Sequence, residues 1–84
     1  MNARCIFRIS FCGDFIEICR TTPPPRDQGQ FFLAFRKKGQ SRRLLLFTGI
    51  TGGGAKRMIQ AFKERRVDLT ALCAYVVEKL RKSR

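Results

Sequence analysis

The chain opens with two runs in which apolar and polar side chains alternate. Residues 4–21 read RCIFRISFCGDFIEICRT, and the two runs meet at Gly13–Asp14. Strict alternation is typical of strands that bury one face. A glycine–aspartate pair between two such runs fits a tight two-residue turn. The pattern therefore predicts an antiparallel hairpin with its turn at Gly13–Asp14.

This turn sets a register and gives the hairpin two different faces. Phe11 then lies opposite Ile16, and Ile9 lies opposite Ile18, so one face is almost entirely apolar. The other face is mixed and can lie in water or meet a ligand. It holds Ile6, Arg8, Ser10, Cys12, Phe15, Glu17, Cys19 and Thr21.

A second strand pair follows a proline-rich stretch. Residues 22–29, TPPPRDQG, contain three prolines that cannot donate to a strand ladder, and they predict a surface loop. The segments QFFLAFRKK and RRLLLFTG, on either side of Gly39, predict two further strands. Because Phe31 and Phe32 point to opposite faces, one aromatic side chain is left over whichever face meets the core.

From Gly54 onward the apolar residues follow a helical period. They stand at Ala55, Met58, Ile59, Phe62, Leu69, Leu72, Cys73, Val76, Val77 and Leu80. Arg65 and Arg66 interrupt this stripe, and Asp68 is a candidate N-cap for a second helix. Positions 55, 62, 69 and 76 stay in heptad phase, so one long, kinked helix is also compatible with the pattern.

These elements predict an α+β domain of the order ββββα. An antiparallel sheet over residues 4–48 would be followed by a helical segment over residues 54–82, packed on one face of the sheet. All 84 residues form one domain in this interpretation. A chain of this size buries only about 60–65% of its unfolded surface, so we expect two chains to pair as a homodimer.

The charge of the chain narrows its function. Eighteen Lys and Arg stand against six Asp and Glu, which gives a net charge of +12. This excess is larger than solubility requires and indicates polyanionic partners. Residues 29–67 hold ten of the cations and one anion, so the middle of the chain supplies +9 of the total.

Several classes of site lack the residues they need. The chain has no histidine, no C-x-x-C pair and no paired carboxylates, so we expect no metal site, no cofactor and no enzymatic activity. The glycine run before Ala55 lacks the Gly-Lys-Ser/Thr sequence of a nucleotide-binding loop. The four cysteines lie in apolar patterns and are interpreted as buried free thiols in a reducing compartment.

The apolar runs also bear on location. None reaches the roughly 18 residues that a membrane-spanning helix needs, and the N-terminus lacks the apolar core of a secretory signal. We therefore expect an intracellular protein with no membrane partner and no small-molecule substrate.

Ten residues are candidates for a nucleic-acid site, because cations neutralise phosphates and aromatic rings stack on unpaired bases. Lys56 and Arg57 stand in the first helical turn, where cations are unfavourable unless an anion binds. The simpler alternatives are a flexible glycine connector before these two, burial of the leftover phenylalanine, and a solvated turn at residues 35–43. The candidates are Arg8, Phe15, Phe32, Arg36, Lys37, Lys38, Arg42, Arg43, Lys56 and Arg57.

The order of these segments resembles a known family. FIEICR, GQFFLAFRKKG, RRLLLF and GGAKRMIQAFKE together resemble the PUR repeat and, more loosely, the Whirly and positive-cofactor-four families of single-stranded nucleic-acid binders. The likeness spans residues 4–67, and the lysine-rich KGKAAL-type motif of Whirly proteins is absent. The resemblance implies a curved four-stranded sheet crossed by a helix, which binds single-stranded DNA or RNA on its open face as a dimer or as two paired repeats.

The sequence thus predicts a single-stranded DNA- or RNA-binding protein that is not an enzyme. Two alternatives remain open. One is a basic protein-interaction or assembly module without nucleic-acid affinity, which docks a partner on the exposed sheet face. The other is a duplex-binding module whose helix at residues 56–66 enters a groove.

Overall fold

The computed structural model describes residues 2–22 and 30–82. In this part of the chain four strands form one antiparallel sheet in the order β1-β2-β3-β4, and two helices follow. The elements are β1 (Asn2–Phe11), β2 (Asp14–Thr22), β3 (Phe31–Arg36), β4 (Arg43–Ile50), α1 (Gly52–Lys63) and α2 (Leu69–Lys82). The predicted α+β class and ββββα order are confirmed. Of the predicted loop at 22–29, Thr22 belongs to β2 and the rest lies outside the described residues.

The first hairpin turns one residue earlier than the sequence predicted. Its central residues are Cys12 and Gly13, both with positive φ (50° and 82°), as in the mirror-image turns that match strand twist. Phe11 therefore pairs with Asp14, and the predicted pairing of Phe11 with Ile16 is wrong. The error shifts the register by two residues, which is one full period of side-chain alternation. Every side chain beyond the turn consequently keeps its predicted face.

A bulge in β1 changes one face assignment. Cys5 pairs with Cys19 and Phe7 pairs with Ile18, so Ile6 is an extra residue on β1. Such a bulge re-aims the side chains on one side of it. It places Cys5 on the same face as Cys19, although simple alternation along β1 would put Cys5 with Phe7.

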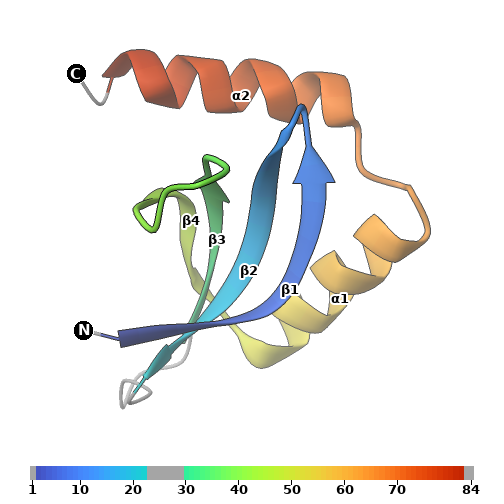
Figure 1. Cartoon of the computed structure of the whole chain (residues 1–84). Coiled ribbons are helices and arrows are strands. Elements are labelled where there is room, and N and C mark those ends of the chain that lie inside the picture. The colour runs from blue at the N-terminus through green and yellow to red at the C-terminus, as the bar shows by residue number, and fades with distance from the viewer. Residues whose placement is uncertain (1, 23–29, 83–84) are drawn as a thin grey trace.

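One face of the sheet forms the core with both helices. The buried apolar residues that contact one another come from all four strands and from each helix: Phe11, Ile16, Ile18, Leu33, Phe35, Leu46, Ala55 and Val76. Figure 1 shows a strongly bent sheet, with α1 on the β1 side of the view and α2 passing across the turn between β1 and β2. Of the strands, α1 contacts β3 and α2 contacts β4. We call the opposite side of the sheet the open face. The predicted packing of helices on one face is confirmed.

The helical segment is divided into two helices by specific caps. Thr51 caps α1, because its hydroxyl oxygen accepts a hydrogen bond from the Gly54 N–H at 3.1 Å, so the helix begins at Gly52 and the predicted start at Gly54 was too late. The carboxylate of Asp68 accepts hydrogen bonds from the N–H groups of Thr70 and Ala71 at 3.0 and 3.1 Å. The predicted N-cap at Asp68 is confirmed, and the alternative of one long helix is wrong.

The end of α1 depends on a left-handed arginine. Arg65 has φ 56°, its N–H donates to the Phe62 carbonyl, and the next N–H, of Arg66, donates to the Ala61 carbonyl at 2.9 Å. This hydrogen-bond pattern ends many helices, usually with glycine at the left-handed position. An arginine here carries the steric cost of a Cβ atom in the left-handed region.

Replacing Arg65 by glycine is therefore expected to stabilise the protein by roughly 0.5–1 kcal/mol. Removing the Cβ atom from the left-handed region stabilises the folded state by about 1–2 kcal/mol. The greater backbone freedom of glycine in the unfolded chain offsets about 0.5–1 kcal/mol of this gain. Chemical denaturation monitored by circular dichroism measures the change. Arg66→Gly is the matched control, since it removes the same charge from an exposed residue without positive φ. Equal changes in the two variants would contradict this explanation.

Candidate nucleic-acid interface

A buried carboxylate lies at the centre of the open face. The side chain of Glu17, on β2, is 1% exposed and faces one arginine from each of the other strands. Arg43 Nε lies 2.8 Å from Glu17 Oε1, and Arg36 Nε lies 3.2 Å from Oε2. Arg8 Nη1 lies 3.9 Å from Oε2. These four residues form what we call the Glu17 cluster.

The strand register explains why the cluster forms. Arg8 is directly opposite Glu17 across the β1–β2 ladder, and Arg36 is directly opposite Arg43 across the β3–β4 ladder. Directly opposed side chains point to the same face and contact each other. The small side chain of Ala34, which pairs with Glu17 on β3, leaves room for the longer arginine side chains to reach the carboxylate.

The cluster is ionised and carries excess positive charge. Burial alone would raise the pKa of Glu17, but hydrogen bonds from Arg43 and Arg36 outweigh it and hold the pKa below its ordinary value. The same hydrogen bond from Arg43 to Glu17 raises the pKa of Arg43. One carboxylate therefore faces three guanidinium groups, and two positive charges remain uncompensated within the cluster.

Phe15 holds two of these arginines in place. The guanidinium carbons of Arg8 and Arg36 lie 4.9 and 5.0 Å from the centre of its ring, within the range of cation–π attraction. The ring is half-buried. In this arrangement Phe15 supports the arginine side chains, and a base reaching this point would meet guanidinium groups as well as the ring.

The cluster lines a wide hollow on the surface. Its volume is about 530 Å³, and its polar lining comes from Arg8, Glu17, Arg36, Arg43 and Ser41, with Cys5, Ile6 and Phe7 completing the wall. Several guanidinium groups around an open hollow suit a phosphate or carboxylate group, because arginine can donate two parallel hydrogen bonds to either anion.

The β3–β4 hairpin presents further cations beside the cluster. Lys37, Lys38 and Arg42 are exposed. The hairpin backbone is held at two points, because the Arg36 guanidinium donates to the Gln40 carbonyl at 2.8 Å and the Lys38 N–H donates to Asp14 Oδ1 at 2.9 Å. The turn at residues 35–43 is therefore tied both to the cluster, through Arg36, and to the β1–β2 hairpin, through Asp14.

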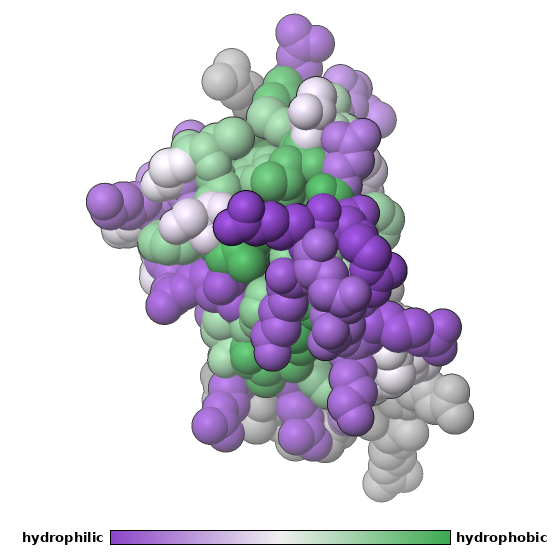
Figure 2. Space-filling model, turned by 90° about the vertical axis from the view of Figure 1, so that its right-hand side faces the viewer, coloured by the Kyte–Doolittle hydropathy of each residue, from purple (hydrophilic) through white to green (hydrophobic). Residues whose placement is uncertain are grey.

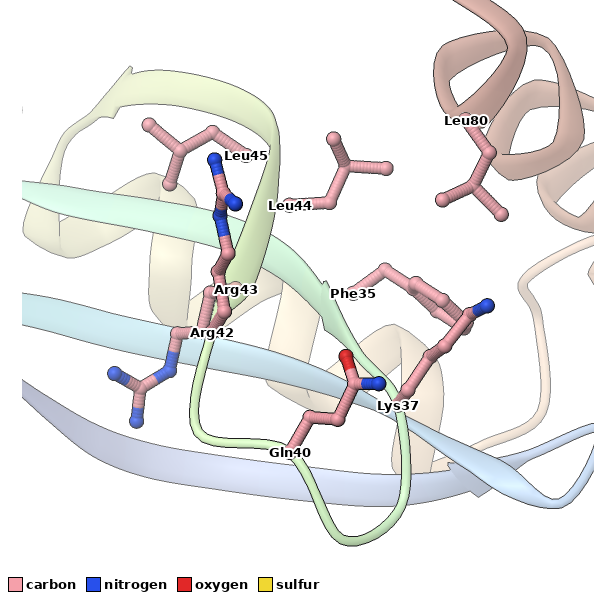
Figure 3. A pocket seen from close by; sticks show the side chains of 8 residues that line it. All are labelled: Phe35, Lys37, Gln40, Arg42, Arg43, Leu44, Leu45 and Leu80. Carbon is pink, nitrogen blue, oxygen red and sulfur yellow. The ribbon is translucent and has the colours of Figure 1, made fainter. Parts of the chain in front are cut away.

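A second hollow lies between this hairpin and α2. It has a volume of about 320 Å³, with Lys37, Gln40, Arg42 and Arg43 on its polar side and Phe35, Leu44, Leu45 and Leu80 on its apolar side. Figure 3 shows Leu80 of α2 facing Leu44 and Phe35, and the side chain of Arg42 directed away from that of Arg43. The hairpin thus borders a hollow on each side.

The structure separates the ten candidate residues into two groups. Lys56 and Arg57 are exposed on α1. Figure 2, which views the molecule from the right-hand side of Figure 1, shows hydrophilic side chains gathered at mid-height on that side. Phe32 is half-buried and pairs with Cys19 across the β2–β3 ladder. The open face and its hairpin hold the remaining group: Arg8, Phe15, Phe32, Arg36, Lys37, Lys38, Arg42 and Arg43.

Sequence reasoning missed three features of this site. Glu17 was placed on the mixed face, but its position among three arginines can be recognised only once the pairing of all four strands is known. Ser41 gave no signal, because it stands in a connecting segment. Cys5 reaches this face only through the bulge at Ile6, which alternation cannot reveal. Together with Glu17 and Cys19, it forms a group whose sulfur and carboxylate oxygen atoms lie within 4.8 Å of one another.

Comparison with protein-family models, with curated proteins and with solved structures finds no match to this chain. Within the described residues, neither helix is long and apolar enough to cross a membrane.

Proposed function

We propose that this protein binds single-stranded nucleic acid on the open face of its sheet and the β3–β4 hairpin, and that it acts by binding, without catalysis. The observation that carries the proposal is the Glu17 cluster: three arginines gathered around a single buried carboxylate, on the sheet face that neither helix covers in the described part of the chain. Lys37, Lys38 and Arg42 extend this positive surface to the hairpin. A groove of fixed cations that follows a backbone is the usual basis of binding to single strands.

The arrangement favours a single strand over a duplex. The half-buried ring of Phe32 lies on the same face as the arginines and offers a stacking surface to an unpaired base. A base in a duplex is already stacked and cannot use this ring. The competing duplex hypothesis relies on α1, whose exposed cations Lys56 and Arg57 lie outside the Glu17 cluster.

We further propose that the binding form is a homodimer. β4 lies at the edge of the sheet, and Leu45 and Phe47 on it are 49% and 48% exposed. An exposed apolar edge strand is prone to pair with another strand. Pairing between two copies would cover these side chains and place two open faces in one assembly.

Fluorescence polarisation with single-stranded DNA, single-stranded RNA and duplex of equal length tests the proposal. Each probe is titrated across a salt series. If about five cations contact phosphates, log K for the single strands is expected to fall with log salt at a slope of roughly −3 to −4, because each contact contributes about 0.7. Tighter binding of the duplex would assign the function to α1. Absence of binding to all three probes at physiological salt would favour the protein-interaction alternative.

A further inference from the structure

Two cysteines stand directly opposite each other under the arginines of the open face. Cys5 on β1 and Cys19 on β2 are cross-strand partners, and their side chains share one face. Directly opposed residues have Cα atoms about 4.5–5.5 Å apart, within the range that a disulfide requires. The two sulfur atoms lie within 4.8 Å of each other. Both thiols are free.

The two thiols differ in access to solvent. Cys5 is half-buried and lines the hollow of the Glu17 cluster, whereas Cys19 is 0% exposed. A reagent entering the hollow can therefore reach the Cys5 sulfur and not that of Cys19. Arg8, Arg36 and Arg43 line the same hollow and favour a reagent that carries carboxylates. The bulge at Ile6 directly follows Cys5 and re-aims its side chain to the face of Cys19.

We propose that Cys5 and Cys19 form a thiol–disulfide exchange site, which a small anionic disulfide such as oxidised glutathione converts to an intramolecular disulfide. The Cys5 thiolate attacks one sulfur of the reagent, forms a mixed disulfide and releases one glutathione thiolate. The Cys19 thiolate then attacks the Cys5 sulfur and releases the second. Two protein thiols are oxidised, one reagent disulfide is reduced to two thiols, and the two protein protons pass to the glutathione thiolates.

The surroundings of the two thiols make the exchange slow. Burial raises the pKa of Cys5, and it raises the pKa of Cys19 to about 11, while the nearby charges of Arg8 and Arg43 act in the opposite direction. Because the thiolate is the nucleophile, an incubation over hours at mildly alkaline pH is the suitable assay.

The background for the experiment is a variant with Cys12→Ser and Cys73→Ser. These substitutions remove the other two thiols and keep Cys5 and Cys19. After incubation with oxidised glutathione and an acid quench, intact mass spectrometry is expected to show the loss of two hydrogens, and peptide mapping a Cys5–Cys19 link. The disulfide is also expected to raise the Tm, because it restricts the unfolded chain.

Two further variants separate the two steps. With Cys19→Ala added, the reaction is expected to stop at one glutathione adduct on Cys5, and with Cys5→Ser added no adduct is expected in the folded protein. Circular dichroism confirms that each variant is folded, and Cys19→Ser replaces Cys19→Ala if the latter is not. Two thiols that stay reduced in the folded background protein would overturn the proposal. The proposal would also be overturned if the two thiols resisted oxidised glutathione until a chelator was added, since this would assign Cys5, Glu17 and Cys19 to a bound metal ion.

Discussion

Replacing Glu17 by glutamine is expected to lower the free energy of unfolding by about 2–3 kcal/mol. Removing one partner of a fully buried ion pair costs about 3–5 kcal/mol, because the other charge stays buried without compensation. Here the arginines keep part of their surface in water, 17% for Arg36 and 27% for Arg43, and can turn outward when the carboxylate is lost. Because of this partial exposure, we expect a smaller loss of stability than a fully buried ion pair would give. Small domains have a total stability of about 5–15 kcal/mol, so the change is large.

The dependence on pH separates loss of the carboxylate charge from general disruption. The pKa of Glu17 is lower in the folded protein than in the unfolded chain, where it lies near 4.3. Its stabilising contribution is therefore complete above about pH 4.3 and is lost as the pH falls through the folded pKa. The difference in stability between the natural protein and Glu17→Gln should accordingly be constant near neutral pH and should narrow on acidification.

Urea denaturation at several pH values measures both effects. Glu64→Gln is the control, because Glu64 forms an exposed ion pair with Arg66 that contributes little. A Glu17→Gln variant that is as stable as the Glu64→Gln variant at neutral pH would show that the Glu17 cluster does not form in solution.

Much of the fold could be predicted because its signals are local. The alternation along β1 and β2 assigned the core face correctly, and the capping residue Asp68 marked the start of α2. The register error at the first turn has a physical cause. Both Gly13–Asp14 and Cys12–Gly13 can occupy a two-residue turn, and the choice requires Cys12 to adopt a positive φ that a cysteine seldom adopts.

The candidate site was less predictable because it depends on pairing between distant strands. Arg8 and Phe15 were predicted on the mixed face of the first hairpin, and Arg36 and Arg43 were identified only as candidate phosphate-binding cations. Nothing along the chain placed one carboxylate among three arginines. The end of α1 was similarly hidden, since Arg65 stands where glycine is the usual signal. In the first case the deciding interaction joins residues that lie far apart in the sequence. In the second, a single residue adopts a conformation that its type seldom adopts.

The Glu17 cluster links the stability of the sheet to its charge. The carboxylate accepts hydrogen bonds from Arg36 and Arg43, forms a longer ion pair with Arg8 and cancels only one of the three positive charges. Arginines held in this way lose little conformational entropy when they meet a phosphate. The cations of the hairpin differ: Lys37, Lys38 and Arg42 are exposed and lie outside the cluster, so they can be changed without disturbing Glu17.

Replacing Lys37, Lys38 and Arg42 together by glutamine is expected to weaken single-strand binding roughly 100-fold at about 0.1 M salt. Each phosphate contact contributes a slope of about 0.7 in log K against log salt, so at 0.1 M each accounts for about 0.7 log units and three for about 2. The slope itself should become shallower by about 2. Because the three side chains are exposed and the hairpin is held through backbone atoms of Lys38 and Gln40, the Tm should stay nearly unchanged.

The matched control carries Lys56→Gln, Arg57→Gln and Lys63→Gln. These residues are also exposed, and replacing them also removes three positive charges, but they lie on α1. If the open face and hairpin form the binding surface, the control should lose affinity only a few-fold, because charges farther than about 10 Å from the strand are screened at this salt concentration. Equal losses in the two triple variants would mean that net charge alone governs binding. A larger loss in the α1 variant would move the nucleic acid to α1 and restore the duplex-binding hypothesis.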